Sequence, residues 1–105
     1  MYLIGVVRSI QDIRCGVGEI MSSVSEIISE IKKVAIYYPS WRIGITNDPN
    51  RCKQEHGDPV RWYQWYAVRE TSARNVEKYF LDKYMKRVGG GGISPNHVYI
   101  FYIGQ

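Results

Sequence analysis

The stretch 41–57 constrains the fold most strongly, because it combines a short strand, a turn and a capped helix. Its first residues are β-prone and lead into Asn47 and Asp48, either of which can act as a helix N-cap. Pro49 then occupies the first helical position, where its missing N–H costs nothing, and Gly57 suits the left-handed residue that ends a helix. The stretch therefore predicts a strand followed by a short helix that carries basic residues and a histidine.

A helix N-terminus beside basic side chains can bind an anion, although an ordinary strand–turn–helix junction with a solvated basic face has the same pattern. The stretch also resembles the second half of the motif of the GIY-YIG nuclease family. The residues that match the motif's strand, turn and helix are Ile43-Gly44, Thr46-Asn47 and His56. The resemblance extends over roughly residues 36–87. It implies that Glu77, on a later helix, holds a divalent metal ion, which would be Mg²⁺.

The chain departs from that motif at several positions. Arg42 stands where the family has its second tyrosine, and Cys52 stands where the family has its arginine, with Arg51 one residue earlier. The first tripeptide of the motif has a counterpart in residues 35–37. For phosphodiester hydrolysis, the resemblance implies an activator, a cation and an acid or base; these would be Tyr37 or Tyr38, Arg42 or Arg51, and His56. An arginine cannot perform the acid–base chemistry of a phenol near neutral pH, so the changes favour binding over catalysis.

A heptad pattern runs through the first third of the chain. With Leu3 as the first a position, every a and d position through Val34 is aliphatic. The pattern predicts a long N-terminal helix, with helix through Gly18–Val34, although Gly16 and Gly18 permit a break between two helical pieces. Ile and Val at both positions favour a homo-oligomer of more than two chains through residues 3–35. Apolar residues at e widen the stripe, which equally suits packing on the chain's own sheet.

Two apolar segments predict further strands. Residues 60–70 are rich in Trp, Tyr and Val, and one face carries Arg61, Tyr63, Trp65 and Arg69. That face either stacks on bases and pairs with phosphates, or fills a small core with arginines at its rim. Residues 98–103 are apolar on both faces and predict a buried or central strand, for which residues 41–46 are one candidate partner. Such pairing would bring Tyr99 or Tyr102 near the site.

A helix is predicted from Ser72 to Arg87, with the serine as its cap. Glu77 falls at the edge of the apolar stripe of this helix, where a carboxylate needs a partner. That partner is either an arginine from the sheet, such as Arg42 or Arg69, or the metal ion that the resemblance implies.

Charge and cysteine usage limit the partners and the compartment. The chain of 105 residues has a formal net charge of +4, and the excess lies in residues 37–105, because residues 1–36 contain equal numbers of acidic and basic side chains. Such a surface suits a polyanion. The two cysteines and the lack of a signal pattern predict a reducing, cytoplasmic setting. No apolar run approaches the length of a membrane span, so no membrane partner is expected.

We therefore expect an α+β fold with a small, mainly antiparallel sheet of three or four strands flanked by helices and preceded by a long helix. Residues 1–36 would form the helical segment and residues 37–105 the GIY-YIG-like domain. The expected function is binding of DNA or RNA with a degenerate or weak catalytic site. The alternatives are an active metal-dependent endonuclease and a structural or regulatory homo-oligomer without nucleic-acid affinity. The expected catalytic residues are Tyr37, Arg42, Arg51, His56 and Glu77, the last also as metal ligand. The expected nucleic-acid contacts are Arg42, Arg51, Lys53, Arg61 and Arg69.

Overall fold

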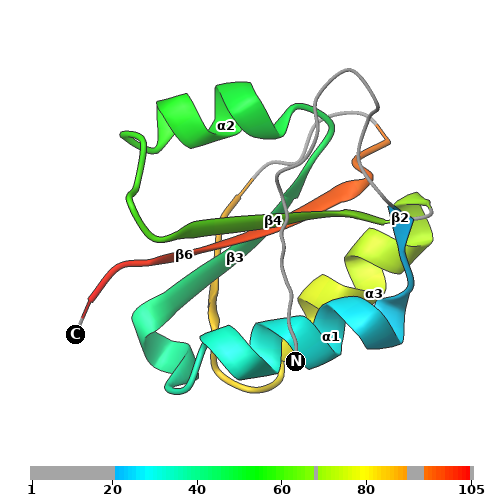
Figure 1. The fold of residues 1–105 in the computed structure, drawn as a ribbon, viewed down its shortest axis with the longest axis horizontal. Helices are drawn as coiled ribbons and strands as arrows, with labels where there is room; N and C mark the ends of the chain where they lie inside the picture. The colour runs from blue at the N-terminus through cyan, green and yellow to red at the C-terminus, as the bar shows by residue number, and fades with distance from the viewer. Residues whose placement is uncertain (1–20, 68, 90–93, 105) are drawn as a thin grey trace.

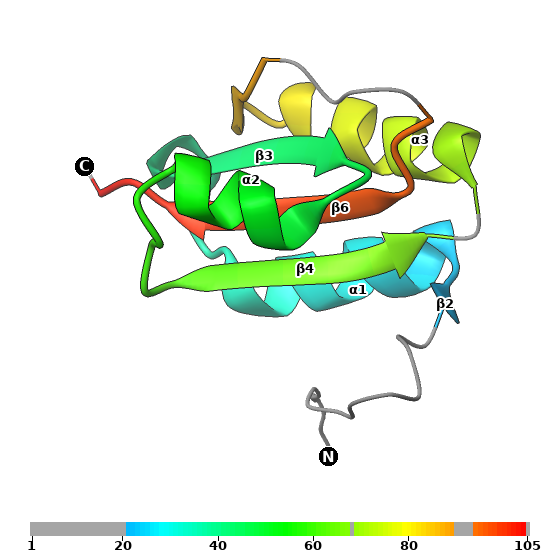
Figure 2. The same cartoon turned by 90° about the horizontal axis from the view of Figure 1, so that it is seen from above.

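The computed structural model describes residues 21–67, 69–89 and 94–104. In these ranges the chain folds as an α+β protein in which helices cover both faces of a five-stranded mixed sheet (Figures 1 and 2). The strands are β2 (Met21–Ser22), β3 (Trp41–Thr46), β4 (Trp62–Ala67), β5 (Lys86–Arg87) and β6 (His97–Tyr102). The helices are α1 (Val24–Val34), the short 3₁₀ helix η1 (Tyr38–Ser40), α2 (Pro49–Glu55) and α3 (Glu70–Leu81).

The last strand in the sequence, β6, is the central strand of the sheet. The spatial order is β2-β4-β6-β3-β5, and β6 runs antiparallel to both of its neighbours. The expected pairing of the C-terminal strand with β3 is thus confirmed, as is the α+β class. The sheet has more strands than expected and is mixed, because the two-residue strands β2 and β5 pair in parallel at its edges. Strands this short leave no hydrophobic period in a sequence.

Helix α1 begins later than the heptad pattern predicts. Met21 and Ser22 form a strand, and the helix begins after Ser23. The Ser23 hydroxyl accepts a hydrogen bond from the Glu26 N–H at 3.2 Å, and the Glu26 carboxylate accepts one from the Ser23 N–H at 2.8 Å. This reciprocal capping box fixes the start of the helix. Residues 3–20 of the expected oligomerising helix lie outside the described residues.

One face of the sheet carries the main hydrophobic core. Helices α1 and α3 lie side by side on this face (Figure 2). Ile27 and Ile31 of the heptad stripe are fully buried there. The Trp65 indole N–H donates to the Glu30 carboxylate at 2.7 Å, which ties α1 to β4. The described part of the heptad stripe therefore packs inside the chain's own core. The other buried side chains of this core are Ala35, Trp41, Ile43, Ile45, Ala67, Ala73, Val76, Phe80, Met85, Val98 and Ile100.

The opposite face of the sheet carries α2 and a smaller aromatic core. Tyr99 and Phe101 of β6 are buried on this side, and the Trp62 ring stacks on Tyr99 with a centroid distance of 4.6 Å. Alternate residues of β6 thus serve both cores, which explains why that segment is apolar on both faces. No helix among the described residues is long and apolar enough to cross a membrane.

Helix α3 also differs from its predicted bounds, which were Ser72–Arg87. It begins at Glu70 and ends at Leu81, and residues 86–87 belong to β5. The helix ends in a Schellman motif: the Met85 N–H donates to the Phe80 carbonyl and the Tyr84 N–H to that of Leu81. Tyr84 takes the left-handed conformation (φ 77°) that glycine usually occupies, so residue preference gives no signal for this end.

Candidate functional site

The site begins where Gly44 of β3 lies opposite Tyr99 of β6. A Cβ atom at Gly44 would lie 2.4 Å from the Tyr99 hydroxyl oxygen and 2.5 Å from the ring carbon that carries it. Only a glycine at position 44 therefore leaves room for the Tyr99 phenol to lie across β3. The expectation that Tyr99 or Tyr102 stands near the site is met by Tyr99 alone, since Tyr102 lies on the other face against Trp41, 5.4 Å between ring centroids.

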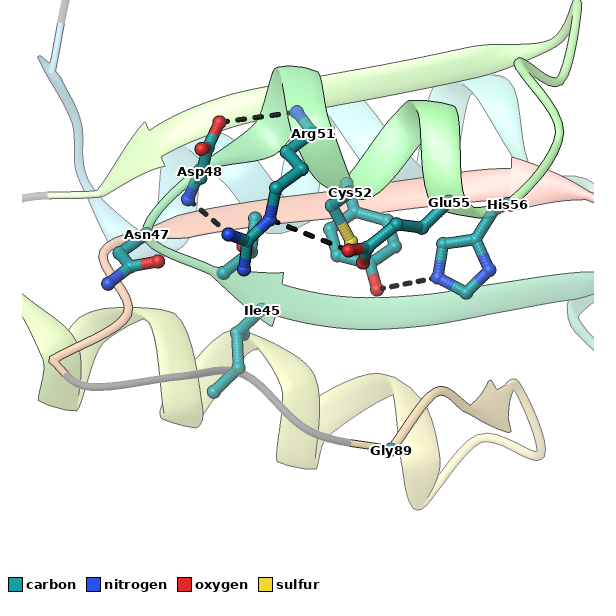
Figure 3. Close-up of a pocket in the computed structure, with 10 residues that line it drawn as sticks. Ile45, Asn47, Asp48, Arg51, Cys52, Glu55, His56 and Gly89 are labelled. Atoms are coloured by element: carbon teal, nitrogen blue, oxygen red, sulfur yellow. Dashed lines mark hydrogen bonds and ion pairs between the residues drawn. The ribbon is translucent and has the colours of Figure 1, made fainter.

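Helix α2 places its side chains over that phenol. The Asp48 carboxylate caps the helix by accepting from the Arg51 N–H at 3.2 Å, so Asp48 is the cap of the two that the sequence offered. Positions four apart lie on one side of a helix, so Cys52 and His56 both face Tyr99. The Tyr99 hydroxyl lies 3.5 Å from His56 Nε2, and the Cys52 side chain packs against the same aromatic cluster (Figure 3).

A pocket lies between the end of β3, the first turns of α2 and the segment after β5. Its lining includes Arg51, Cys52, His56, Tyr99 and, on the far side, Gly89 (Figure 3). The predicted residues Arg51 and His56 are thus brought together. The remaining lining residues are Ile45, Thr46, Asn47, Asp48 and Glu55.

The arginine in the pocket lining is shared with an acidic neighbour. The Arg51 guanidinium lies 3.4 Å from the Glu55 carboxylate, and the two side chains are 72% and 63% exposed. An exposed ion pair of this kind contributes roughly 0–1 kcal/mol, so an incoming anion can replace Glu55 at little cost. The sequence signal for this pair was the i,i+4 spacing of an arginine and a glutamate.

The environment of Tyr99 keeps its hydroxyl protonated. Burial raises the pKa of Tyr99 well above its usual range, and the hydrogen bond with Cys52 and the negative charges of Glu77 and Glu55 raise it further. A neutral phenol can donate a hydrogen bond to a phosphate oxygen. It is a poor general base at neutral pH, because almost none of it is ionised.

Glu77 lies on α3 with only 7% of its surface exposed. Burial raises the pKa of Glu77, and the nearby Arg87 and Arg74 partly oppose that rise. Neither Arg42 nor Arg69, the partners suggested by the sequence, appears among these charges, and Glu77 forms no ion pair within the described residues. It does not line the pocket, but its charge acts on Tyr99.

The other predicted residues lie outside the pocket lining. Arg42 is exposed on β3, directly opposite Lys86 of β5, and Lys53 is partly exposed on α2. The Arg61 guanidinium lies over two rings, 5.0 Å from the Trp41 centroid and 4.5 Å from that of Tyr102. Arg69 is exposed at the start of α3, and Tyr37 is 66% exposed between α1 and η1.

The face of β4 that the sequence offered for base stacking is turned towards the helices. Tyr63, Trp65 and Ala67 alternate on the side of α1, where Ala67 is fully buried and Trp65 packs against the core. Trp62, Gln64 and Tyr66 alternate on the side of α2 instead. Trp65 and Ala67 therefore fill the hydrophobic core, which was the alternative to base stacking for this face of the strand.

The resemblance implied a Mg²⁺ ion at Glu77. Across residues 21–67, 69–89 and 94–104, no group of three or more His, Cys, Asp or Glu side chains is arranged to hold a metal ion. Mg²⁺ usually keeps several waters and binds through one or two carboxylates together with substrate phosphates. Glu77 offers one carboxylate, buried and already in the field of Arg87 and Arg74. A Mg²⁺ ion at Glu77 therefore stays a prediction.

Comparisons of the chain with protein-family models, with curated proteins and with solved structures found no match.

Proposed function

We propose that this chain is a GIY-YIG-like nucleic-acid-binding module with a degenerate or weak catalytic site. The observation that carries the proposal is the pocket over Gly44, where a phenol that stays protonated lies beside Arg51 and His56. A backbone phosphate in this pocket would accept hydrogen bonds from the Tyr99 hydroxyl and the Arg51 guanidinium. The groups that bind a phosphate are present, whereas the phenol is held in the form that cannot act as a base.

The surrounding charges support a polyanionic partner. Arg42, Lys53 and Arg69 form no ion pair in the part of the chain that the structure describes. Arg42 and Lys86 lie on neighbouring strands of the same face, so their charges add near the start of β3. Uncompensated cations beside a pocket attract phosphates and release counterions when they bind. Arginine at position 42 adds positive charge without a proton-transfer group.

The test is fluorescence anisotropy with labelled DNA and RNA oligonucleotides over a series of salt concentrations. We expect binding that weakens steeply with salt, and about tenfold weaker binding for Tyr99→Phe, because a hydrogen bond to a charged group is lost. Tyr102→Phe, on the opposite face, is the matched control and should bind like the wild type. Binding that is absent, or insensitive to salt, would overturn the proposal.

The alternative function is an active, metal-dependent endonuclease, and the position of His56 favours it. Nε2 of this histidine lies 3.5 Å from the Tyr99 hydroxyl, close enough for proton transfer if the two groups move slightly together. The experiment is nicking of supercoiled plasmid with Mg²⁺ or Mn²⁺ by the wild type and by Glu77→Ala. Cleavage by the wild type that Glu77→Ala lacks would establish the nuclease. Salt-sensitive binding without cleavage would support the nucleic-acid-binding module and argue against the nuclease.

A further inference from the structure

Beyond α2, the same face of the sheet carries a row of side chains that leads away from the pocket. The strand register places Met21 beside Tyr66, Tyr66 beside His97, and His97 beside Thr46. Directly paired residues share a face of the sheet, so all four side chains lie on the side of α2. Thr46 lines the pocket, which makes the row continuous with the proposed phosphate site. Tyr66 lies two strands from Thr46, roughly 10 Å away.

The middle of the row is a stacked aromatic pair. The Tyr66 and His97 rings are 5.0 Å apart between centroids and inclined by only 19°. The Asn96 side-chain oxygen lies 3.0 Å from His97 Nδ1 and helps to fix the orientation of the imidazole. The geometry is that of an aromatic pair stacked nearly in parallel.

This pair differs from the aromatic rings beneath α2 in its exposure. Tyr99 and Phe101 are 1% and 6% exposed, whereas Tyr66 and His97 are both partly exposed and Met21 is 53% exposed. Figure 2 shows the reason: α2 lies over β3 and β6, and the arrowhead of β4 and the strand β2 extend beyond it. Partly exposed aromatic and apolar side chains that lie together on an outer face suit an interaction site.

We propose that Met21, Tyr66 and His97 form a shelf for an unpaired base of a single-stranded nucleic acid, whose neighbouring phosphate occupies the pocket. This inference rests on the proposed function and adds the substrate class. A base in a duplex is already paired and stacked on both sides, so only an unpaired base can lie on such a shelf. The row itself carries no acidic side chain to repel a phosphate backbone.

The test compares a single strand with a duplex of the same sequence, using Tyr66→Ala, Tyr66→Phe and Tyr63→Ala. Tyr63 belongs to the same strand and is 38% exposed on the opposite face, so its removal is the matched control. We expect Tyr66→Ala to bind the single strand about tenfold more weakly, because one base–aromatic contact is lost. The slope of log affinity against log salt should not change, because no phosphate contact is removed. Tyr66→Phe and Tyr63→Ala should bind like the wild type.

A second readout reports the stacking itself. A single strand that contains 2-aminopurine should lose fluorescence when it binds to the wild type, and this quenching should be absent with Tyr66→Ala. Salt-dependent binding by the wild type together with equal affinities for Tyr66→Ala and Tyr63→Ala would overturn the shelf and leave the proposed function standing. No salt-dependent binding by the wild type would overturn both. A change in self-association with Tyr66→Ala, without a change in binding, would identify the shelf as a protein contact and also overturn the inference.

Discussion

At the scale of single residues, Gly44 decides whether the site can form. Its missing side chain is what allows the Tyr99 phenol to cross β3, with 2.4 Å between a hypothetical Cβ and the hydroxyl oxygen. We expect Gly44→Ala to lower the free energy of unfolding by about 1–3 kcal/mol, because either the strand or the ring must move. Denaturant unfolding measures this change, and anisotropy measures the accompanying loss of nucleic-acid affinity. Gly89→Ala is the control for the unfolding measurement, since a Cβ there meets nothing within 4 Å. Equal effects of the two substitutions would contradict this account.

Glu77 is the residue whose charge should set a pH dependence of stability. Burial raises its pKa above 4.5, so the folded state binds the proton more tightly than the unfolded chain does. Protonation of Glu77 therefore stabilises the folded state. This stabilisation is fully present below pH 4.5 and is lost as the pH rises through the raised pKa of Glu77. Glu77→Gln is neutral throughout, so it should match the wild type in acid and be more stable at pH 7, by on the order of 1 kcal/mol.

Unfolding curves of the wild type and Glu77→Gln between pH 4 and pH 8 measure this difference. Glu55→Gln serves as the control, because the Glu55 side chain is 63% exposed. A wild type that is more stable than Glu77→Gln at pH 7 would mean that Arg87 and Arg74 outweigh the cost of burial.

At the scale of elements, α1 is fixed by its cap and by the core it fills. We expect Ser23→Ala to cost about 0.5–2 kcal/mol, because the capping box is lost, and Ile27→Ala about 2–5 kcal/mol, because a cavity forms. Ser29→Ala, on the exposed side of the same helix, should change little. Thermal melts at several protein concentrations measure all three variants. Losses of stability that depend on protein concentration would show that the apolar stripe of α1 contacts a second chain. That result would contradict the burial of this stripe in the core of one chain.

Elements with local signals could be predicted from the sequence, and elements fixed by distant contacts could not. A cap at Asn47 or Asp48, together with Pro49 and Gly57, predicted the start of α2 and the turn that follows it. In the structure Asp48 is the cap, and Gly57 has a φ of 81°. The heptad pattern continued through Met21–Ser22, which pair with β4 instead. The end of α3 was missed because Tyr84 takes a conformation that its side chain disfavours.

At the scale of the whole molecule, the candidate site depends on the place of β6 between β3 and β4. Arg51 and His56 could be predicted together, because one short helix carries both. Tyr99 could be proposed only on the condition that the last strand pairs with β3, since more than 40 residues separate it from His56. The face of β4 that meets the helices could not be decided from alternation, because both faces carry aromatic residues.

The summed charge of the molecule leads to a last prediction, on metal and salt. If phosphates are bound by Arg42, Lys86 and the pocket, removal of divalent metal with EDTA should leave affinity unchanged, because arginine, lysine and tyrosine side chains bind a phosphate without a metal ion. Arg42→Ala should weaken binding to all sequences alike and reduce the slope of log affinity against log salt by about 1, because one counterion-releasing contact is lost. Arg74→Ala is the control, since that arginine is already paired with Glu70 at 2.8 Å. Affinity that collapses in EDTA and returns with Mg²⁺ would favour the metal-dependent alternative, because the ion would then link the phosphate to a carboxylate such as Glu77.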